Sequence, residues 1–291
     1  MRQALQSDFP DLGIRTLTAL GEGWNSNAYL VNEEWVFRFP KRKDVEKNLQ
    51  RELALLPELS QHLPVALPQF AFTALAPVSF PFIYAGYQKM PGAFAWDVPN
   101  DDLDQGAIAH SFAEVLMALH AFPPDRALDL GCEEEYTPFT GATRQRVAEE
   151  FAKIPPWPKH REYQERLHRY LDSVDISSLG APERFLVIHG DLLPDHLLLP
   201  QSLDRISAII DWGEVKVGDP AAEFAGLYYW LGRDFVDSVL HHYRLAYDPA
   251  MLERARFIAL AVGIGDVWYG IDANLPAYLK VGLACLDHCL P

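Results

Sequence analysis

The stretch Val187–Pro200, "VIHGDLLPDHLLLP", constrains the fold of this chain more than any other stretch does. It places four ionisable side chains between two apolar runs: His189, Asp191, Asp195 and His196. Ionisable groups beside buried residues must be paired, hydrogen-bonded or bound to a metal. The stretch therefore predicts a tight loop between buried strands that serves metal binding, proton transfer or only a polar turn.

A second apolar run, "RISAIIDW", ends at Asp211 and is followed by Gly213. Asp211 lies 20 residues after Asp191, which is enough for one hairpin to return the chain to the same place. We therefore expect the two carboxylates to meet in one cleft. Seen by itself, the Asp-Trp-Gly sequence is equally compatible with an ordinary turn.

Earlier in the chain, a charged residue interrupts an aromatic strand. In "WVFRF" (35–39) the aromatic side chains face one way and Arg38 faces the other. A charge within such a run must be paired or must meet an anion. Glu52 follows 14 residues later, in a helix predicted over Asp44–Leu59 whose leucine stripe turns it toward the sheet. Arg38 is thus expected to have Glu52 or an anion as its partner.

The loop "GEGWNSNAY" joins two predicted strands ahead of Arg38. Gly21 and Gly23 allow a close approach of the backbone to phosphates, and Asn25 and Ser26 supply polar contacts. A glycine-rich hairpin alone is usually only a turn. Its position before the other motifs makes it informative.

Loop, strand cation, helix glutamate and two aspartates follow one another in the order found in kinases. In a kinase catalytic loop the aspartate accepts the proton of the substrate hydroxyl, and the residue five positions later holds a metal ion. This likeness implies that Asp191 is the catalytic base and that His196 and Asp211 bind Mg²⁺, although Mg²⁺ prefers oxygen ligands. Arg38 stands where kinases carry lysine, so the charge is kept while the phosphate geometry changes.

Three segments resemble the aminoglycoside phosphotransferase family, a kinase-like group that also includes macrolide phosphotransferases: "WVFRFPKRKDVEKNLQRELALL", "VIHGDLLPDHLLL" and "IIDWGEVKVGDPAAEF". They are most similar to the aminoglycoside 2″-phosphotransferases, which can carry histidine at the place of His196. The resemblance implies ATP or GTP and Mg²⁺ as cofactors, with Arg38 and Glu52 positioning the phosphates. It also implies a hinge at 87–92 that meets the purine and includes Tyr87, Lys89 and Met90.

The predicted fold class is α+β, a bilobal arrangement similar to that of protein kinases. Residues 1–91 are expected to form a small, β-rich, nucleotide-binding lobe with one main helix. The segment "PGAFAWDVPNDD" resembles a linker. A strongly amphipathic helix is expected after it, over Asp104–Phe122. Residues 92–291 are expected to form a larger, mostly helical lobe for catalysis and acceptor binding.

Too few residues lie between Asp211 and the "GDP" sequence at 218–220 to build the platform on which a kinase holds a protein, so a small-molecule acceptor is expected. The helical region after it supplies the candidate acceptor contacts Glu223, Asp266 and Trp268. Carboxylates suit ammonium groups, and aromatic faces suit sugar rings or cations. Ordinary solvated helix charge remains the alternative for the two acids. Three further aromatic residues are expected in the core: Tyr228, Tyr229 and Trp230.

The net charge of −15 argues against nucleic-acid binding and is compatible with a cationic acceptor. The N-terminus has no apolar signal segment, and no apolar run approaches the ~18–20 residues of a membrane span. Three cysteines suit a reducing compartment, so we expect the protein in the cytoplasm. We also expect it to be a monomer. Cys285, His288 and Cys289 fall at helical spacing, which favours packing over a metal clip.

Other functions stay open at this point. A macrolide phosphotransferase or a housekeeping kinase of a small metabolite would share the same fold and differ in the acceptor region. A metal-dependent hydrolase could use His189, Asp191 and His196, but that reading leaves Arg38 and Glu52 unexplained. A nucleotide-binding module with little catalysis is a third alternative, kept open by Arg38. Aminoglycosides are expected ahead of macrolides.

Overall fold

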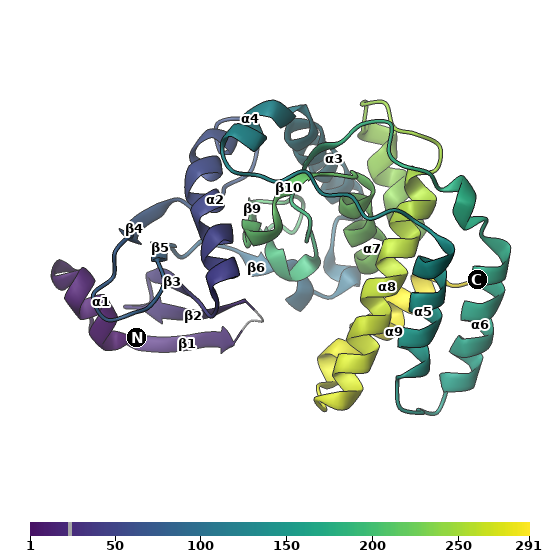
Figure 1. Cartoon of the computed structure of the whole chain (residues 1–291), viewed down its shortest axis with the longest axis horizontal. Helices are drawn as coiled ribbons and strands as arrows, with labels where there is room; N and C mark the ends of the chain where they lie inside the picture. Colours follow the sequence, from purple (N-terminus) through teal and green to yellow (C-terminus); the bar gives the residue numbers. More distant parts are fainter. Residues whose placement is uncertain (23–24) are drawn as a thin grey trace.

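The computed structural model describes residues 1–22 and 25–291 and has two lobes (Figure 1). Gly23, which we expected at the phosphates, lies outside the described residues. The N-lobe is built on an antiparallel sheet in the order β1-β2-β3-β5-β4. Its strands are β1 (Leu17–Glu22), β2 (Ser26–Val31), β3 (Trp35–Pro40), β4 (Phe70–Ala74) and β5 (Tyr84–Gln88).

The two faces of this sheet have different neighbours. Phe37 and Phe39 are fully buried in an aromatic cluster with Tyr84, as the alternation in β3 predicts. The short helix α1 (Arg2–Asp8) closes this cluster, since Asp8 accepts a hydrogen bond of 2.6 Å from the Tyr84 hydroxyl. Arg38 is left on the opposite face, where α2 (Lys43–Leu59) packs.

The C-lobe is mainly helical, with two small sheets at its boundary with the N-lobe. β6 (Ala93–Phe94), β8 (Leu197–Leu199) and β9 (Ala208–Ile209) form one sheet, and β7 (Leu186–Ile188) pairs with β10 (Lys216–Gly218). The helices are α3 (Gln105–Ala121), α4 (Pro124–Asp129), α5 (Gly141–Ala152), α6 (His160–Ser173), α7 (Ala221–His242), α8 (Met251–Asp272) and α9 (Pro276–Cys289).

These elements confirm the expected fold class of a small β-rich lobe beside a larger helical lobe. The main N-lobe helix begins one residue before the predicted start and ends at the predicted residue, Leu59. Tyr228, Tyr229 and Trp230 are buried in the core as expected. None of the helices in the described ranges combines the length and apolarity that crossing a bilayer requires.

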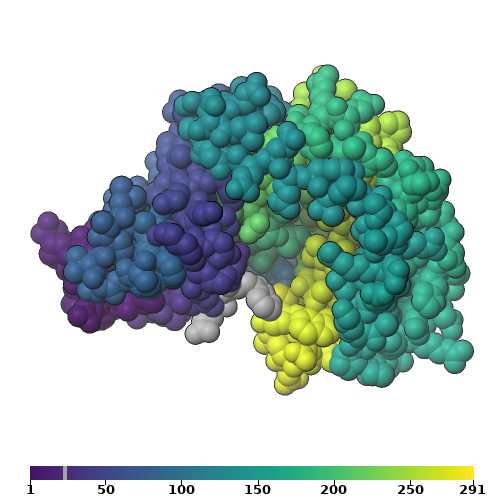
Figure 2. All heavy atoms as spheres, in the orientation of Figure 1, coloured from purple at the N-terminus to yellow at the C-terminus, as the bar shows by residue number. Residues whose placement is uncertain are grey.

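The two lobes meet around a hollow, which the space-filling view shows between the purple and blue N-lobe and the green and yellow C-lobe (Figure 2). β7 and β10 carry the two aspartate motifs to this boundary, since each motif adjoins one of these paired strands. The fold thereby brings chain segments 173 residues apart, at Arg38 and Asp211, into direct contact.

Candidate active site

The loop after β7 is shaped by a glycine and a short 3₁₀ turn. Gly190 has a φ of +82°, and a Cβ at this position would lie 2.6 Å from the Glu214 carbonyl oxygen. A 3₁₀ turn over Pro194–His196 then leads into β8. The loop therefore presents Asp191 and His196 from a compact backbone that only glycine fits at its start.

His189 is a structural residue in this loop. It is fully buried, its Nε2 donates to the Ile210 carbonyl at 3.0 Å, and its Nδ1 accepts from the Asp191 amide at 3.3 Å. Burial lowers the pKa of His189 to about 3, so the ring is neutral. Both ring nitrogens are used, which argues against the metal-hydrolase trio of His189, Asp191 and His196.

Asp191 is half-buried at the boundary between the lobes. Burial raises the pKa of its carboxyl to about 6, although the neighbouring His196 opposes this shift. A carboxylate with a pKa near the working pH is suited to accept a proton from a hydroxyl group.

The ring of His196 has a defined orientation. Its Nδ1 lies 2.7 Å from the Asp191 carbonyl oxygen and therefore donates a hydrogen bond to it. Its Nε2 faces two carboxylates, at 3.8 Å from Asp211 Oδ2 and 3.9 Å from Asp195 Oδ2. Burial acts to lower the pKa of His196, but the surrounding carboxylates raise it overall. The loop backbone thus directs one nitrogen of this ring toward Asp211.

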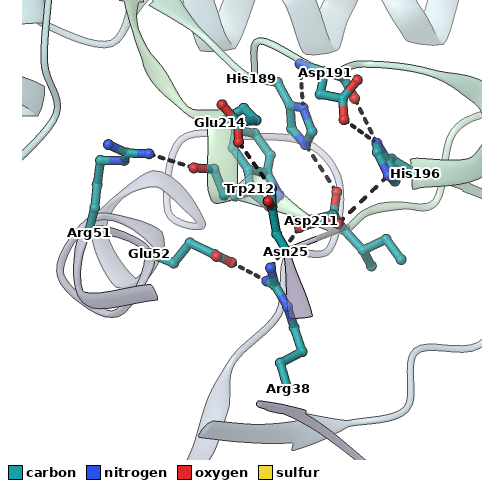
Figure 3. A network of polar contacts seen from close by, with 12 residues as sticks. Asn25, Arg38, Arg51, Glu52, His189, Asp191, His196, Asp211, Trp212 and Glu214 are labelled. Atoms are coloured by element: carbon teal, nitrogen blue, oxygen red, sulfur yellow. Dashed lines mark hydrogen bonds and ion pairs between the residues drawn. The ribbon is translucent and has the colours of Figure 1, made fainter. Parts of the chain in front are cut away.

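Arg38 bridges helix and aspartate, as Figure 3 shows. Its two terminal nitrogens donate to Glu52 at 2.6 Å and to Asp211 Oδ1 at 2.7 Å. Glu52 is fully buried, and burial raises its pKa to about 7 in spite of the adjacent guanidinium. Arg38 holds the pKa of Asp211 below its usual range. The expected Arg38–Glu52 pair is present. The planar guanidinium group of Arg38 binds the carboxylates of Glu52 and Asp211 at the same time.

The predicted magnesium ligands can be tested by their chemistry. Asp211 uses Oδ1 for Arg38, which leaves Oδ2 facing the Nε2 of His196. Within residues 1–22 and 25–291, no group of three or more His, Cys, Asp or Glu side chains is arranged to hold a metal ion. Mg²⁺ is commonly held by one or two protein ligands together with phosphate oxygens, so this donor pair fits a nucleotide-bound ion and not an all-protein site.

Two further contacts cross between the lobes beside this pair. Arg51, next to Glu52 on α2, donates to the Gly213 carbonyl at 2.5 Å, and the Asn25 amide donates to Glu214 at 3.4 Å. The sequence predicted Asn25 as a phosphate contact but did not indicate the contact of Arg51 with Gly213. Gly21 and Ser26 lie in β1 and at the start of β2, on either side of the predicted phosphate loop.

The predicted hinge residues differ in their environments. Tyr87 is buried in β5 on the sheet face that carries Arg38, and burial raises its pKa to about 12. The backbone amide of Lys89 already donates to the Glu34 carbonyl at 2.7 Å, so it is not available to a purine. Met90 follows in the chain segment that leads to β6.

Glu223 is placed differently from our expectation. It is fully buried near the start of α7, where its carboxylate accepts a hydrogen bond of 3.0 Å from the Gly190 amide. Burial raises its pKa to about 7. Glu223 supports the loop that carries Asp191, and its full burial keeps it from contact with an acceptor.

Asp266, by contrast, lies near Asp191. Its carboxylate accepts a hydrogen bond of 2.7 Å from the Tyr229 hydroxyl. Burial raises its pKa to about 6, and the negative charges of Asp195 and Asp191 add to this shift. The loop of Asp191 and Asp195 and helix α8 therefore face each other across a strip of acidic side chains formed by these two residues and Asp266.

Aromatic side chains lie beside these acidic residues. The ring of Tyr278 on α9 lies 5.0 Å from that of Tyr269 and 5.5 Å from that of Trp96, measured between centroids. Trp268 is 40% exposed but sits about 200° around α8 from Asp266, so the two do not share a face. Sequence reasoning identified Asp195 only as an ionisable residue of the loop and missed Trp96 and Tyr278, because no local pattern shows that these three residues lie close together.

Fold and site together define the class of this protein, a phosphotransferase with a kinase-like fold. A family model described as "Phosphotransferase enzyme family" matches residues 16–258. The chain belongs to this family.

Two solved structures illustrate the similarity. Wild-type aminoglycoside 2'-phosphotransferase-IIIa, in a GDP complex, is 26% identical with a TM-score of 0.70 over 98% of this chain and 96% of that one. Macrolide 2'-phosphotransferase type I is 25% identical with a TM-score of 0.64 over 98% of this chain and 96% of that one. The expected resemblance to aminoglycoside and macrolide phosphotransferases is confirmed.

Among curated proteins, the uncharacterized protein YcbJ of Bacillus subtilis (strain 168) is 26% identical over 203 residues, or 65% of this chain. The chain spans 61% of the length of that relative.

Proposed function

We propose that this protein transfers the γ-phosphoryl group of ATP or GTP to a hydroxyl group of a cationic, aminoglycoside-like small molecule. The observation that carries this proposal is the single network of Arg38, Glu52 and Asp211 beside Asp191. A strand cation held by a helix glutamate, next to a metal-type aspartate and a candidate base, is the arrangement that phosphoryl transfer requires.

In the proposed reaction, Asp191 accepts the proton of the acceptor hydroxyl as its oxygen attacks the γ-phosphorus. The bond between this phosphorus and the β,γ-bridging oxygen breaks, and the nucleoside diphosphate leaves. The half-buried position of Asp191 and its raised pKa support this role. Arg38 holds the nucleotide phosphates by charge, and Glu52 fixes the guanidinium.

Mg²⁺ would be held by His196 Nε2 and Asp211 Oδ2, and it would neutralise charge on the phosphate oxygens. The hydrogen bond from His196 Nδ1 to the Asp191 carbonyl supports this assignment, because it keeps Nε2 directed at Asp211. For the purine, the backbone of Met90 is the better candidate contact, since the amide of Lys89 is engaged.

The acceptor would bind along α8, with an ammonium group near Asp266 and Asp195. One oxygen of Asp195, Oδ1, is buried without a hydrogen-bond partner among the described residues, which supports a polar ligand at this place. The aromatic rings of Trp96 and Tyr278 would cover a sugar face or a cation beside it.

The test is a nucleotide-consumption assay with aminoglycosides, macrolides and amino alcohols, each with ATP and with GTP. Asp191→Asn should lower kcat by at least ~10²-fold, the scale of losing a general base. Asp101→Asn, on an exposed carboxylate, should leave kcat unchanged. Nearly normal turnover in Asp191→Asn would reject the proposed base, and no transfer to any acceptor by the native chain would reject the function.

A further inference from the structure

Arg254 is a fully buried cation on α8, outside the candidate active site. All five of its guanidinium hydrogens have acceptors. Asp219 accepts two hydrogen bonds, of 2.6 and 3.1 Å, and Asp248 accepts two, of 2.7 and 2.8 Å. The carbonyl of Leu179 accepts the fifth, at 3.0 Å. Arg254 therefore holds three chain segments around one planar group.

Stability alone does not explain this buried charge cluster. Burial of charged groups is costly, and apolar side chains of similar volume often stabilise a fold as well as a buried ion pair does. Asp219 and Asp248 are both only 8% exposed. Burial acts to raise the pKa of Asp248, but the hydrogen bonds from Arg254 lower it overall. What the cluster supplies is a fixed geometry, because a planar guanidinium group orients both carboxylates.

The two aspartates precede different helices. Asp219 lies two residues before α7, and its Oδ1 also accepts from the amide of Ala221, the first residue of that helix, at 2.9 Å. Asp248 Oδ1 accepts from the Ala250 amide at 3.1 Å, directly before α8. Helices α7 and α8 pack against each other (Figure 1). Arg254 thus anchors the start of α7 to the start of α8.

The anchored start of α7 also supports the loop of Asp191. Glu223 is the third residue of α7, and its carboxylate accepts a hydrogen bond of 3.0 Å from the Gly190 amide. Gly190 is bonded covalently to Asp191. The path from Arg254 to Asp191 therefore runs through Asp219, the first turn of α7 and Glu223, and both carboxylates on this path are buried.

We propose that Asp219 and Arg254 are positioning residues for Asp191, acting through the start of α7. This inference rests on the proposed function and adds to it two residues outside the contacts proposed for nucleotide and acceptor. Asp191 must lie at hydrogen-bond distance from the acceptor hydroxyl, and a displacement of about 1 Å can lower turnover by about 100-fold. Nucleotide binding depends on Arg38 from β3, so it should be far less sensitive to this displacement.

Asp219→Asn and Asp248→Asn form a matched pair of variants. Each removes one carboxylate charge from the same arginine at a position of equal exposure, so thermal unfolding should show similar destabilisation. Because Asp219 leads to α7 and Asp248 does not, kcat should fall at least about tenfold in Asp219→Asn and only about twofold in Asp248→Asn. The KM for the nucleotide should change by less than about twofold in both variants. Rates are measured on the full chain, well below both melting temperatures.

Arg254→Lys tests the guanidinium group itself and replaces Asp219→Asn if that variant does not fold. Lysine keeps the charge but has three donors in place of five, so kcat should fall by about tenfold at an unchanged nucleotide KM. Arg166→Lys is the matched control. Arg166 donates to Asp287 at 2.6 Å and to the backbone carbonyls of residues 290 and 291. These partners do not belong to α7, so kcat should be unchanged in this variant.

Hydrogen exchange at the Gly190 amide, measured by NMR, reports on the loop without any turnover. Exchange should be at least about tenfold faster in Asp219→Asn than in Asp248→Asn. Equal losses of kcat in these two variants at similar stability would overturn the inference, and so would a nucleotide KM that rises as much as kcat falls. Failure of the proposed function gives a different result, in which the native chain phosphorylates no acceptor while the difference in Gly190 exchange remains.

Discussion

At the scale of single residues, the two carboxylate oxygens of Asp211 have different partners. One oxygen accepts from Arg38 and the other faces His196 Nε2. Its backbone has a φ of +59°, an uncommon conformation for a residue other than glycine. The turn that produces this conformation aims both oxygens, so the arrangement depends on the local backbone as well as on side-chain charge.

Substitution of Arg38 tests the fork geometry. In Arg38→Lys one ammonium group replaces two nitrogens that hold separate carboxylates, so the KM for the nucleotide should rise by about tenfold or more. Arg38→Ala leaves Glu52 buried without its partner and should also destabilise the fold by about 3–5 kcal/mol. Steady-state kinetics and thermal unfolding measure these effects. An unchanged nucleotide KM in both variants would remove Arg38 from the nucleotide site.

The pKa of Asp266, raised to about 6, predicts a pH dependence of acceptor binding. Above this pH the carboxyl is ionised and attracts an ammonium group, and below it the carboxyl is protonated and neutral. The Kd of a cationic acceptor should therefore rise by up to about tenfold from about pH 7 to about pH 5. Calorimetry at several pH values gives the profile. Asp266→Asn should bind more weakly with a flat profile, and an unaltered pH profile in this variant would assign the effect to another group.

At the scale of secondary-structure elements, α7 supports the loop that carries Asp191 and His196. Glu223 accepts from the Gly190 amide, and Gly226 lies against the next turn of the loop. A Cβ at Gly226 would lie 2.0 Å from the Leu192 carbonyl oxygen. The start of this helix is therefore fixed relative to Asp191 by one hydrogen bond and one close backbone contact.

Gly226→Ala should displace the loop that carries Asp191. The expected destabilisation is about 1–3 kcal/mol, the range of an overpacked site, accompanied by a loss of kcat. Gly265→Ala is the matched control, since a Cβ on this α8 glycine meets nothing within 4 Å among the described atoms. It should be neutral or stabilising by about 0.5–1 kcal/mol. Equal melting temperatures for the two variants would contradict the close contact.

Elements with a strong periodic pattern were predictable from the sequence, whereas their contacts often were not. The leucine stripe predicts α2 and the partnership of Glu52 with Arg38. Helix α1 has seven residues and no side-chain cap, and it depends on burial of Leu5 under the sheet, which no local pattern shows. Glu223 was misassigned because spacing alone does not show which helix residue lies beneath a loop.

At the scale of the whole molecule, the net charge of −15 favours the approach of cations to a carboxylate-lined groove. If several ammonium groups of the acceptor meet these carboxylates, its KM should rise when ionic strength increases from ~0.05 to ~0.5 M, because the Debye length shortens. Initial-rate measurements at fixed nucleotide concentration give the slope. A flat response with a good acceptor would show that apolar contacts dominate its binding.

The contacts of Arg51 with Gly213 and of Asn25 with Glu214 join the two lobes through atoms of the protein itself. Part of the conformational entropy of bringing the lobes together is therefore lost when the chain folds. Such a cleft is preorganised, and the binding energy of the nucleotide is available to orient its phosphates.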